Sequence, residues 1–223
     1  MTAAQPADVN DRDRAYGRAM LYIAGAGGFG RESYDAVLAC ADAPSVGAGE
    51  HGVVAFLDDA CAGEKVRDVP TYFPQDADCG AEFVVAIADP GPRRRLSRLL
   101  TDRGLSPATV VHPAAVIGPE TTIGSGCVIL DPAHVSSSVH VGDHVQINYN
   151  ATVGHDAVLR DFVTVLPGAN VSGAVTLEEG ATVGAGSVIL QGLTVGAGAT
   201  VGAGAVVTHD VCAGVTVKGV PAR

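Results

Sequence analysis

The sequence predicts a Rossmann-like α/β domain followed by an all-β left-handed parallel β-helix. Two observations lead to this expectation. Near the start, a G-x-G-x-x-G loop joins a short apolar run to a segment with helical spacing, and further apolar runs alternate with helical segments, as in a parallel sheet. From Val111 to Val207 every sixth residue is valine, isoleucine or leucine. A period of six fits neither an amphipathic helix nor an alternating strand and is typical of a hexapeptide repeat.

The composition narrows the functional classes. The 223 residues carry a formal net charge of −10, which argues against nucleic acid or an anionic membrane surface as a partner. The single basic run, Arg93 to Arg95, is expected on the solvated face of a helix. Five cysteines without a C-x-x-C pair predict reduced thiols and a cytoplasmic location. Residues 1–19 are polar and are predicted to form a disordered tail.

The Rossmann-like domain is expected over residues 20–105. Periodicity changes to six near residue 106, which marks the domain boundary. Strands are predicted at the apolar runs 21–24, 53–57 and 83–88, and helices at 31–40 and 92–103.

The glycine loop, Gly25 to Gly30, has two interpretations. Backbone N–H groups at a helix N-terminus suit a phosphate or diphosphate, but the loop also fits a tight strand-to-helix turn without a ligand. NAD is the less favoured ligand, because Asp58 lies 28 residues beyond Gly30 and the domain is small for a full dinucleotide fold. The diphosphate of a mononucleotide fits better.

The β-helix is expected over residues 106–223. In each repeat the aliphatic residue and a small residue two positions before it should face inward. The corners should fall two and three residues after the aliphatic residue, and these positions are rich in Gly, Pro, Asp and Ser, as turns require. Corners 18 residues apart should therefore stack along one edge of a three-sided prism.

One of these corners carries the candidate catalytic group. His155 is followed by Asp156, and Gly154 and Gly173 should leave the edge open beside the imidazole. A histidine next to a carboxylate and facing a groove suits a general base. A solvated turn histidine is the alternative, but the nearby polar stretch 146–152 favours a function.

Several motifs give the chain a family resemblance. They are the glycine loop, Phe56-Leu57-Asp58-Asp59, His112-Pro113, Gly154-His155-Asp156, Pro167-Gly168-Ala169 and the closing Val217-Lys218-Gly219-Val220-Pro221-Ala222-Arg223. With them, the sequence resembles the hexapeptide-repeat sugar acyltransferases, which include bacillosamine-pathway N-acetyltransferases and sialic acid O-acetyltransferases.

The resemblance implies an acetyl-CoA-dependent acetyltransferase that uses no metal and forms a homotrimer with sites between subunits. His155 takes the general-base position, and Asp156 is the adjacent carboxylate. The positions that match the nucleotide-sugar pocket are Gly27, Gly28, Phe29, Asp58, Asp59 and Ala88, with Asn148 as a further candidate. The positions that match the coenzyme A groove are Gly173, Ala185 and Ala203, with Thr164 and Lys218 as further candidates. The coenzyme should lie lengthwise along the prism, with its thiol end at His155 and its phosphates near Lys218.

Two departures from the family pattern affect the expected acceptor. Phe29 and Thr164 stand where members of the family can have histidine. A phenyl ring makes the pocket less polar, so the expected acceptor is the amino group of a nucleotide-linked 4-amino-dideoxy sugar. O-acetylation of a sugar or another small hydroxylated acceptor is the alternative. Two other classes are less favoured: a non-catalytic nucleotide-sugar sensor or scaffold, and a zinc enzyme of the γ-carbonic-anhydrase type that uses His140, His144 and His155.

Overall fold

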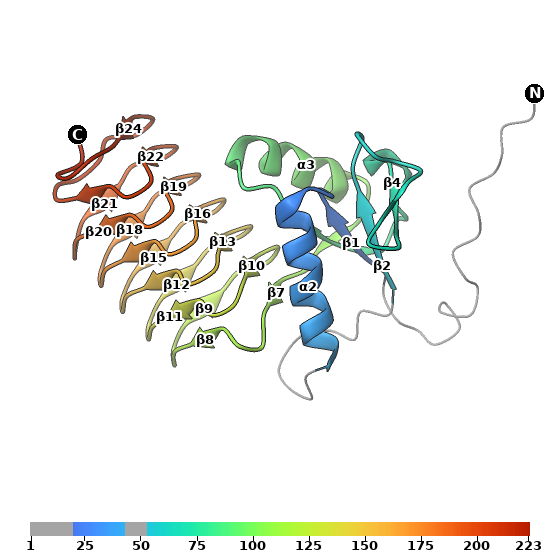
Figure 1. Cartoon of the computed structure of the whole chain (residues 1–223), viewed down its shortest axis with the longest axis horizontal. Coiled ribbons are helices and arrows are strands. Elements are labelled where there is room, and N and C mark those ends of the chain that lie inside the picture. The colour runs from blue at the N-terminus through green and yellow to red at the C-terminus, as the bar shows by residue number, and fades with distance from the viewer. Residues whose placement is uncertain (1–19, 43–52) are drawn as a thin grey trace, which may run out of the picture.

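The structure is a computed structural model that describes residues 20–42 and 53–223 (Figure 1). The disordered tail predicted for residues 1–19 lies outside the described residues. The described chain forms an α/β unit followed by a long parallel β-solenoid. Within these residues, no helix combines the length and the apolar character that a membrane span needs.

The α/β unit contains one six-stranded sheet in the order β3-β4-β2-β1-β5-β6. All neighbouring strands pair in parallel except the short β3–β4 hairpin. The bounds are β1 Met20–Ala24, α2 Gly28–Asp42, β2 Val53–Leu57, β3 Lys65–Val66, β4 Val69–Tyr72, the 3-10 helix Pro74–Asp76, β5 Glu82–Val85, α3 Pro90–Asp102 and β6 Ser106–Pro107.

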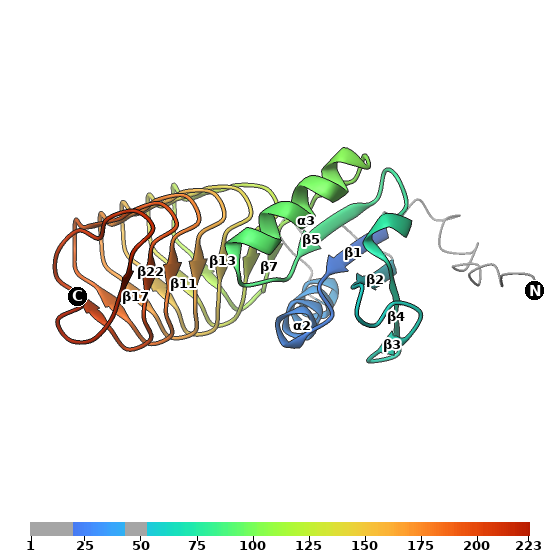
Figure 2. The ribbon, with the colours of Figure 1, turned by 90° about the horizontal axis from the view of Figure 1, so that it is seen from above.

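The two helices cover opposite faces of this sheet (Figure 2). Side chains alternate along β1, so that Leu21 and Ile23 belong to the apolar cluster that contains α2, while Tyr22 belongs to the cluster that contains Leu100 of α3. This alternation follows from the period of two of a β-strand. The predicted parallel strands and covering helices are present, and the finer Rossmann-like assignment stays a prediction.

The solenoid consists of three parallel sheets, which we call face I, face II and face III in the order in which the chain visits them. Face I contains β7 Val110–Val111, β10 Val128–Ile129, β13 Gln146–Ile147, β16 Thr164–Val165, β19 Thr182–Val183, β22 Thr200–Val201 and β24 Thr216–Val217. Face II contains β8 Val116–Ile117, β11 His134–Val135, β14 Thr152–Val153, β17 Asn170–Val171, β20 Val188–Ile189 and β23 Val206–Val207. Face III contains β9 Thr122–Ile123, β12 His140–Val141, β15 Val158–Leu159, β18 Thr176–Leu177 and β21 Thr194–Val195.

The period of six has the expected structural basis. From Cys127 onward, the aliphatic residues and the small residues two positions before them form one buried cluster inside the prism. Strands on one face pair with an offset of 18 residues, as in Thr152 with Asn170. The last coil departs from this rule, because Thr200 pairs with Thr216, only sixteen residues on. One corner of the closing coil is therefore two residues shorter than the others.

The α/β unit packs on the first coils of face I. Val110 and Val128 point out of the prism and join the apolar cluster of α2 and the sheet. Gln146 and Thr164, next along this face, are completely buried, whereas Thr182 beyond them is partly exposed. The described residues of the α/β unit therefore cover face I of the solenoid near its N-terminal end.

Candidate active site

His155 and Asp156 form a hydrogen-bonded pair at the corner between faces II and III. Nδ1 of His155 lies 2.7 Å from Oδ2 of Asp156, and more than half of each side chain is exposed. The backbone holds the corner in place, since the N–H of Ala174 donates to the carbonyl of His155 at 2.7 Å. With Nδ1 facing the carboxylate, Nε2 is free to exchange a proton with a bound molecule.

Gly173 makes room for this imidazole, and Gly154 makes room for the backbone of Gly173. A Cβ atom at Gly173 would lie 2.6 Å from Nε2 of His155, and a Cβ atom at Gly154 would lie 2.4 Å from the backbone nitrogen of Gly173. Both distances are shorter than a van der Waals contact. Gly173 therefore leaves the edge open beside His155 as expected, while Gly154 is needed for the close approach of the next coil's backbone.

A shallow polar groove of about 380 Å³ runs along face II beside this corner. Gly154 belongs to its lining, so the groove ends next to His155. Thr152 donates a hydrogen bond to Oδ1 of Asn170 at 2.9 Å on the floor of the groove. The sequence analysis did not single out Asn170 and Ser172, although they stand 18 residues after Thr152 and Gly154 and so fall on the same face.

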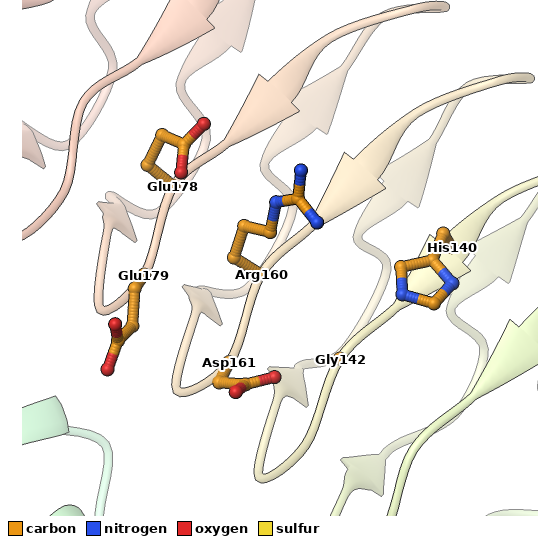
Figure 3. A pocket seen from close by; sticks show the side chains of 6 residues that line it. All are labelled: His140, Gly142, Arg160, Asp161, Glu178 and Glu179. Atoms are coloured by element: carbon orange, nitrogen blue, oxygen red, sulfur yellow. The ribbon is translucent and has the colours of Figure 1, made fainter.

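A second depression, of about 220 Å³, lies between faces III and I. It is lined by His140, Gly142, Arg160, Asp161, Glu178 and Glu179, which come from successive coils (Figure 3). Asp161 accepts a hydrogen bond from the backbone N–H of Asp143 at 2.8 Å, so this carboxylate links neighbouring coils. The imidazole of His140 is paired with the hydroxyl of Thr122. These contacts give the depression a structural role.

The three histidines of the zinc alternative have different surroundings. His140 lies on face III, His144 is buried at the corner between faces III and I, and His155 is exposed at the corner between faces II and III. In the described part of the chain, no three His, Cys, Asp or Glu side chains come together as metal ligands. Within one chain, these three histidines therefore do not come together.

The glycine loop connects β1 to α2 at the carboxyl end of the sheet. Gly25 has a φ of 108°, and a Cβ atom on it would lie 2.8 Å from the carbonyl oxygen of Ala86. Gly27 and Gly28 are exposed, with open space where a side chain would stand. Gly25 is therefore required by packing, while Gly27 and Gly28 leave the N-terminus of α2 accessible to a ligand.

Asp58 shapes this loop from the end of β2. One carboxylate oxygen accepts the N–H of Ala26 at 2.9 Å, and the other accepts the N–H of Ala60 at 2.9 Å. Asp59 beside it is exposed. Of the two aspartates predicted to line the acceptor pocket, Asp58 thus supports the loop, and Asp59 is the one free to meet a ligand.

Phe29 is half-buried and packs on the apolar cluster between α2, the sheet and face I. Tyr149, from the corner between faces I and II, packs on the same cluster. Burial, and secondarily the charge of Glu32, raises the pKa of the Tyr149 hydroxyl. The sequence analysis named Tyr149 only as part of a polar stretch. Tyr149 thus packs on the same apolar cluster as Phe29, at the junction of the two units.

Arg93 requires a correction. It was expected on a solvated helix face, but its side chain is completely buried between the two units. One terminal nitrogen donates to the carbonyls of Ile87 and Ala88, and the other donates to Oγ1 of Thr164 at 2.9 Å. Burial lowers the pKa of Arg93 to about 10. Arg93 shares its side of the helix with the buried Ser97 and Leu100, four and seven residues on, whereas the exposed Arg95 lies on the opposite side.

Thr164 also requires a correction. It was expected along the coenzyme groove, but its side chain is completely buried. Its hydroxyl donates to the carbonyl of Ala88 at 2.8 Å and accepts a hydrogen bond from Arg93. The outward positions of face I are covered by the α/β unit at this coil, so Thr164 connects the two units and faces no groove.

The polar stretch 146–152 has a mixed role. Gln146 is buried and donates to the carbonyl of Val85 at 2.8 Å. Asn148, which was expected near the acceptor, is 4% exposed and donates to the carbonyl of Val165 at 3.0 Å. Gln146 therefore links the α/β unit to the solenoid, and Asn148 stabilises the corner between faces I and II. Thr152 is exposed in the groove beside His155.

His144 joins α3 to the solenoid. Its ring is stacked on Phe162 with a centroid distance of 5.0 Å, and Nε2 lies 2.8 Å from the hydroxyl of Ser97. Burial lowers the pKa of His144 below its ordinary value. The guanidinium carbon of Arg94 lies over this same Phe162 ring, 4.8 Å from its centroid. His144 is therefore buried under α3 at the corner between faces III and I.

The predicted site residues fall into two groups within one chain. His155 and Gly173 lie at the corner between faces II and III, which is the edge opposite face I. The glycine loop belongs to the α/β unit, which covers face I. Ala185, Ala203 and the exposed Lys218 follow strands of face I and lie at the corner between faces I and II. A single chain therefore does not bring the imidazole to the glycine loop.

The fold and the site together define a class of protein. A parallel β-solenoid of hexapeptide repeats carries a His–Asp pair on an open edge, and an α/β unit presents a glycine loop at a helix N-terminus. This combination is suited to group transfer to a ligand held by the α/β unit.

Comparisons with known proteins identify the family. A scan against protein-family models and a search of curated proteins find no match, whereas solved structures match over most of the chain. The acetyltransferase domain of PglB from Neisseria gonorrhoeae has a TM-score of 0.85 and 32% identity, over 92% of this chain and 99% of that domain. WeeI from Acinetobacter baumannii has a TM-score of 0.83 and 33% identity, over 92% of this chain and 98% of its own.

A third match is informative about ligands. A variant of perosamine N-acetyltransferase from Caulobacter crescentus, in complex with CoA and GDP-perosamine, has a TM-score of 0.81 and 29% identity, over 92% of this chain and 95% of that one. On these similarities, the chain belongs to the hexapeptide-repeat family of sugar N-acetyltransferases.

Proposed function

We propose that the protein transfers the acetyl group of acetyl-CoA to the amino group of a nucleotide-linked amino sugar. The observation that carries the proposal is the His155–Asp156 pair, held at 2.7 Å on an open solenoid edge in a chain of the sugar N-acetyltransferase family. Related structures contain acetyl coenzyme A, or CoA with GDP-perosamine. Two of the complexes carry a substitution of one histidine, by asparagine or by alanine.

The chemistry follows from the free Nε2 of His155. Acetyl-CoA supplies an acetyl group activated as a thioester, whose thiolate is a good leaving group because thiol pKa values are near 8.5. Nε2 removes a proton from the acceptor amine as the amine attacks the carbonyl, a role commonly worth about 10²–10⁴ in rate. Asp156 holds Nδ1 and stabilises the imidazolium that forms.

We infer that the complete site is built by two chains of a homotrimer. His155 lies on the edge opposite the face that its own α/β unit covers. An acceptor bound at Gly27 and Gly28 of the same chain would have to reach around the prism. If a neighbouring prism packs alongside in a cyclic assembly, its His155 edge can face this chain's acceptor unit. The same packing would place Gly173 of one chain opposite Ala185 and Ala203 of another.

The remaining assignments complete this proposal. The acceptor unit, residues 20–105, acts as a Rossmann-like nucleotide-sugar domain with Gly27, Gly28, Phe29, Asp59 and Ala88 around the ligand. The solenoid, residues 106–223, is left-handed and carries the coenzyme. Lys218 is exposed, and its backbone pairs with that of Arg223, so two cations stand together where the coenzyme phosphates would bind. A cytoplasmic location is part of the proposal.

A ternary-complex assay tests the function. Purified protein is incubated with acetyl-CoA and a panel of nucleotide-linked sugars, and free thiol is measured. We expect thiol release with 4-amino-dideoxy sugars and none with the matched 4-hydroxy sugars. His155→Ala should lower kcat by about 10²–10⁴ with little change in coenzyme A binding. Release only with hydroxyl acceptors would replace the N-transfer assignment by O-transfer, and release that survives His155→Ala would remove the histidine from the mechanism.

A further inference from the structure

Arg93 is a buried cation whose hydrogen-bond acceptors, among the residues that the structure describes, are all uncharged oxygen atoms. Its side chain is 0% exposed. Its hydrogen-bond acceptors are the carbonyls of Ile87, Ala88, Phe162 and Val163, Oε1 of Gln146 and Oγ1 of Thr164. Burying a charge costs free energy that hydrogen bonds only partly offset. An apolar residue would fill this space at lower cost, so the arginine needs a role beyond stability.

The guanidinium group spans the boundary between the two units. Nη1 donates to the carbonyls of Ile87 and Ala88, at 2.9 and 3.0 Å, and to Oε1 of Gln146 at 2.7 Å. Nη2 donates only to the solenoid, including Oγ1 of Thr164 at 2.9 Å. A planar fork with two terminal nitrogens can make both sets of contacts, whereas the single nitrogen of lysine cannot.

The segment that Arg93 holds is the carboxyl end of β5. Two solenoid side chains bind the same backbone, because Gln146 donates to the carbonyl of Val85 at 2.8 Å and Thr164 donates to the carbonyl of Ala88 at 2.8 Å. We call these three side chains, Arg93, Gln146 and Thr164, the Arg93 network. It fixes the β5–α3 connection to the solenoid at consecutive points.

This connection directly supports the glycine loop. The N–H of Ala86 donates to the carbonyl of Ala24 at 2.8 Å. Gly25 follows and packs so closely that a Cβ atom on it would lie 2.8 Å from the carbonyl oxygen of Ala86. In open parallel sheets, ligands bind at the carboxyl ends of neighbouring strands such as β1 and β5. The Arg93 network therefore acts on the backbone next to the place where the acceptor should bind.

We propose that Arg93 is a positioning residue, which sets the place of the acceptor relative to the solenoid by holding the β5–α3 connection. The inference rests on the proposed function, because it assumes that the acceptor binds at the glycine loop. Arg93 contacts no reacting atom and acts through Ala88, Ala86 and the loop. A loose acceptor unit would present the amine away from the thioester, and a displacement of about 1 Å can cost about 10² in rate.

Steady-state kinetics with Arg93→Lys test the need for the fork. The variant keeps the charge but lacks the second terminal nitrogen. We expect kcat/KM for the nucleotide sugar to fall by about 10²-fold, through both kcat and KM, while the KM for acetyl-CoA changes by less than about twofold. Arg95→Lys is the matched control, since Arg95 is exposed on the same helix, and it should behave as the wild type.

Thr164→Val provides a milder variant in case Arg93→Lys folds poorly. It removes the hydroxyl that links Ala88 to Arg93 and keeps the shape of the side chain. We expect kcat/KM for the nucleotide sugar to fall in this variant too, by a smaller factor than in Arg93→Lys. Full activity in Arg93→Lys, or an equal rise in the KM for both substrates, would overturn the positioning role and leave a structural one.

Hydrogen exchange separates this proposal from the proposed function. Arg93→Lys should accelerate amide exchange in peptides that cover residues 24–30 and 85–90, and leave peptides from 182–207 at the wild-type rate. Faster exchange in a protein that acetylates no amino sugar would refute the proposed function, and the Arg93 network would then hold a loop with another use. If peptides 24–30 and 85–90 both exchange at the wild-type rate in Arg93→Lys, the proposal that the Arg93 network holds these segments is refuted.

Discussion

A single methyl group at Gly173 should displace the catalytic imidazole without disturbing the fold. Its Cβ atom would lie 2.6 Å from Nε2 of His155, where an ordinary contact begins at 3.4 Å, so the ring must move by roughly 0.8 Å. The backbone accepts alanine here, because the equivalent corner positions two coils before and one coil after Gly173 are Ser137 and Gln191. His155 is exposed and can move aside without breaking the core.

The expected loss of kcat follows from this displacement of the imidazole. A general base misplaced by about 1 Å loses on the order of 10² in rate, which corresponds to about 2.7 kcal/mol of transition-state stabilisation. We therefore expect Gly173→Ala to lower kcat by about 10²-fold, with a thermal midpoint within a few degrees of the wild type.

The assay is thiol release at saturating acetyl-CoA and acceptor, with circular dichroism melting on the same samples. Ser137→Ala is the matched control, since it places alanine at the equivalent corner on the other side of His155 and should retain wild-type kcat. A wild-type kcat in Gly173→Ala would refute the argument that Nε2 works at this spot. A collapse of the thermal midpoint would show that the glycine serves the coil.

Three further changes test other parts of the site. Phe29→His should shift preference toward more hydroxylated nucleotide sugars without abolishing turnover, and an unchanged ranking across a sugar panel would count against a sugar-facing Phe29. Burial lowers the pKa of His144 below 6.5, so its stability contribution is complete above that pH and is lost as the pH falls toward the folded value. The thermal midpoint of the wild type should thus drop more on acidification than that of His144→Gln, and parallel curves would contradict this. Lys218→Ala should raise the KM for acetyl-CoA and reduce its salt dependence, and identical salt curves would remove Lys218 from the phosphate site.

The solenoid could be predicted because every coil places the same requirements on its sequence. Each coil needs an aliphatic residue inside, a small residue two positions before it and a turn at each corner, so one pattern is written many times between Val111 and Val207. The same hexapeptide repeat predicts that His155 lies on an edge with Gly173 stacked on it, as the structure shows. The pattern ended at Val207, where the structure shows the shortened corner of the closing coil.

The contacts between the two units could not be predicted in this way. Arg93 bonds to Thr164 and Gln146, which are 71 and 53 residues away, and each of these contacts occurs once in the chain. The helical pattern places Arg93 on the side of Ser97 and Leu100, opposite the exposed Arg95, but it does not name the solenoid residues that the arginine meets. A threonine before the aliphatic residue is also ordinary for an exposed strand position, so the burial of Thr164 depends on a neighbour that the repeat does not encode.

Subunit complementation tests the central claim, that one chain supplies His155 and another supplies the acceptor unit. His155→Ala abolishes the base, and Gly28→Glu places a carboxylate where the diphosphate should bind, in space that is open in the structure. Each variant alone should be nearly inactive. If the two variants are coexpressed in equal amounts and assemble at random, about one quarter of the sites in a cyclic trimer combine an intact histidine with an intact loop from the neighbouring chain. We predict that the whole population of oligomers from the coexpression, purified without separating mixed from unmixed species, recovers about that fraction of wild-type thiol release. Mixed oligomers that stay as inactive as either parent would show that each chain uses its own histidine, and would contradict the two-chain site.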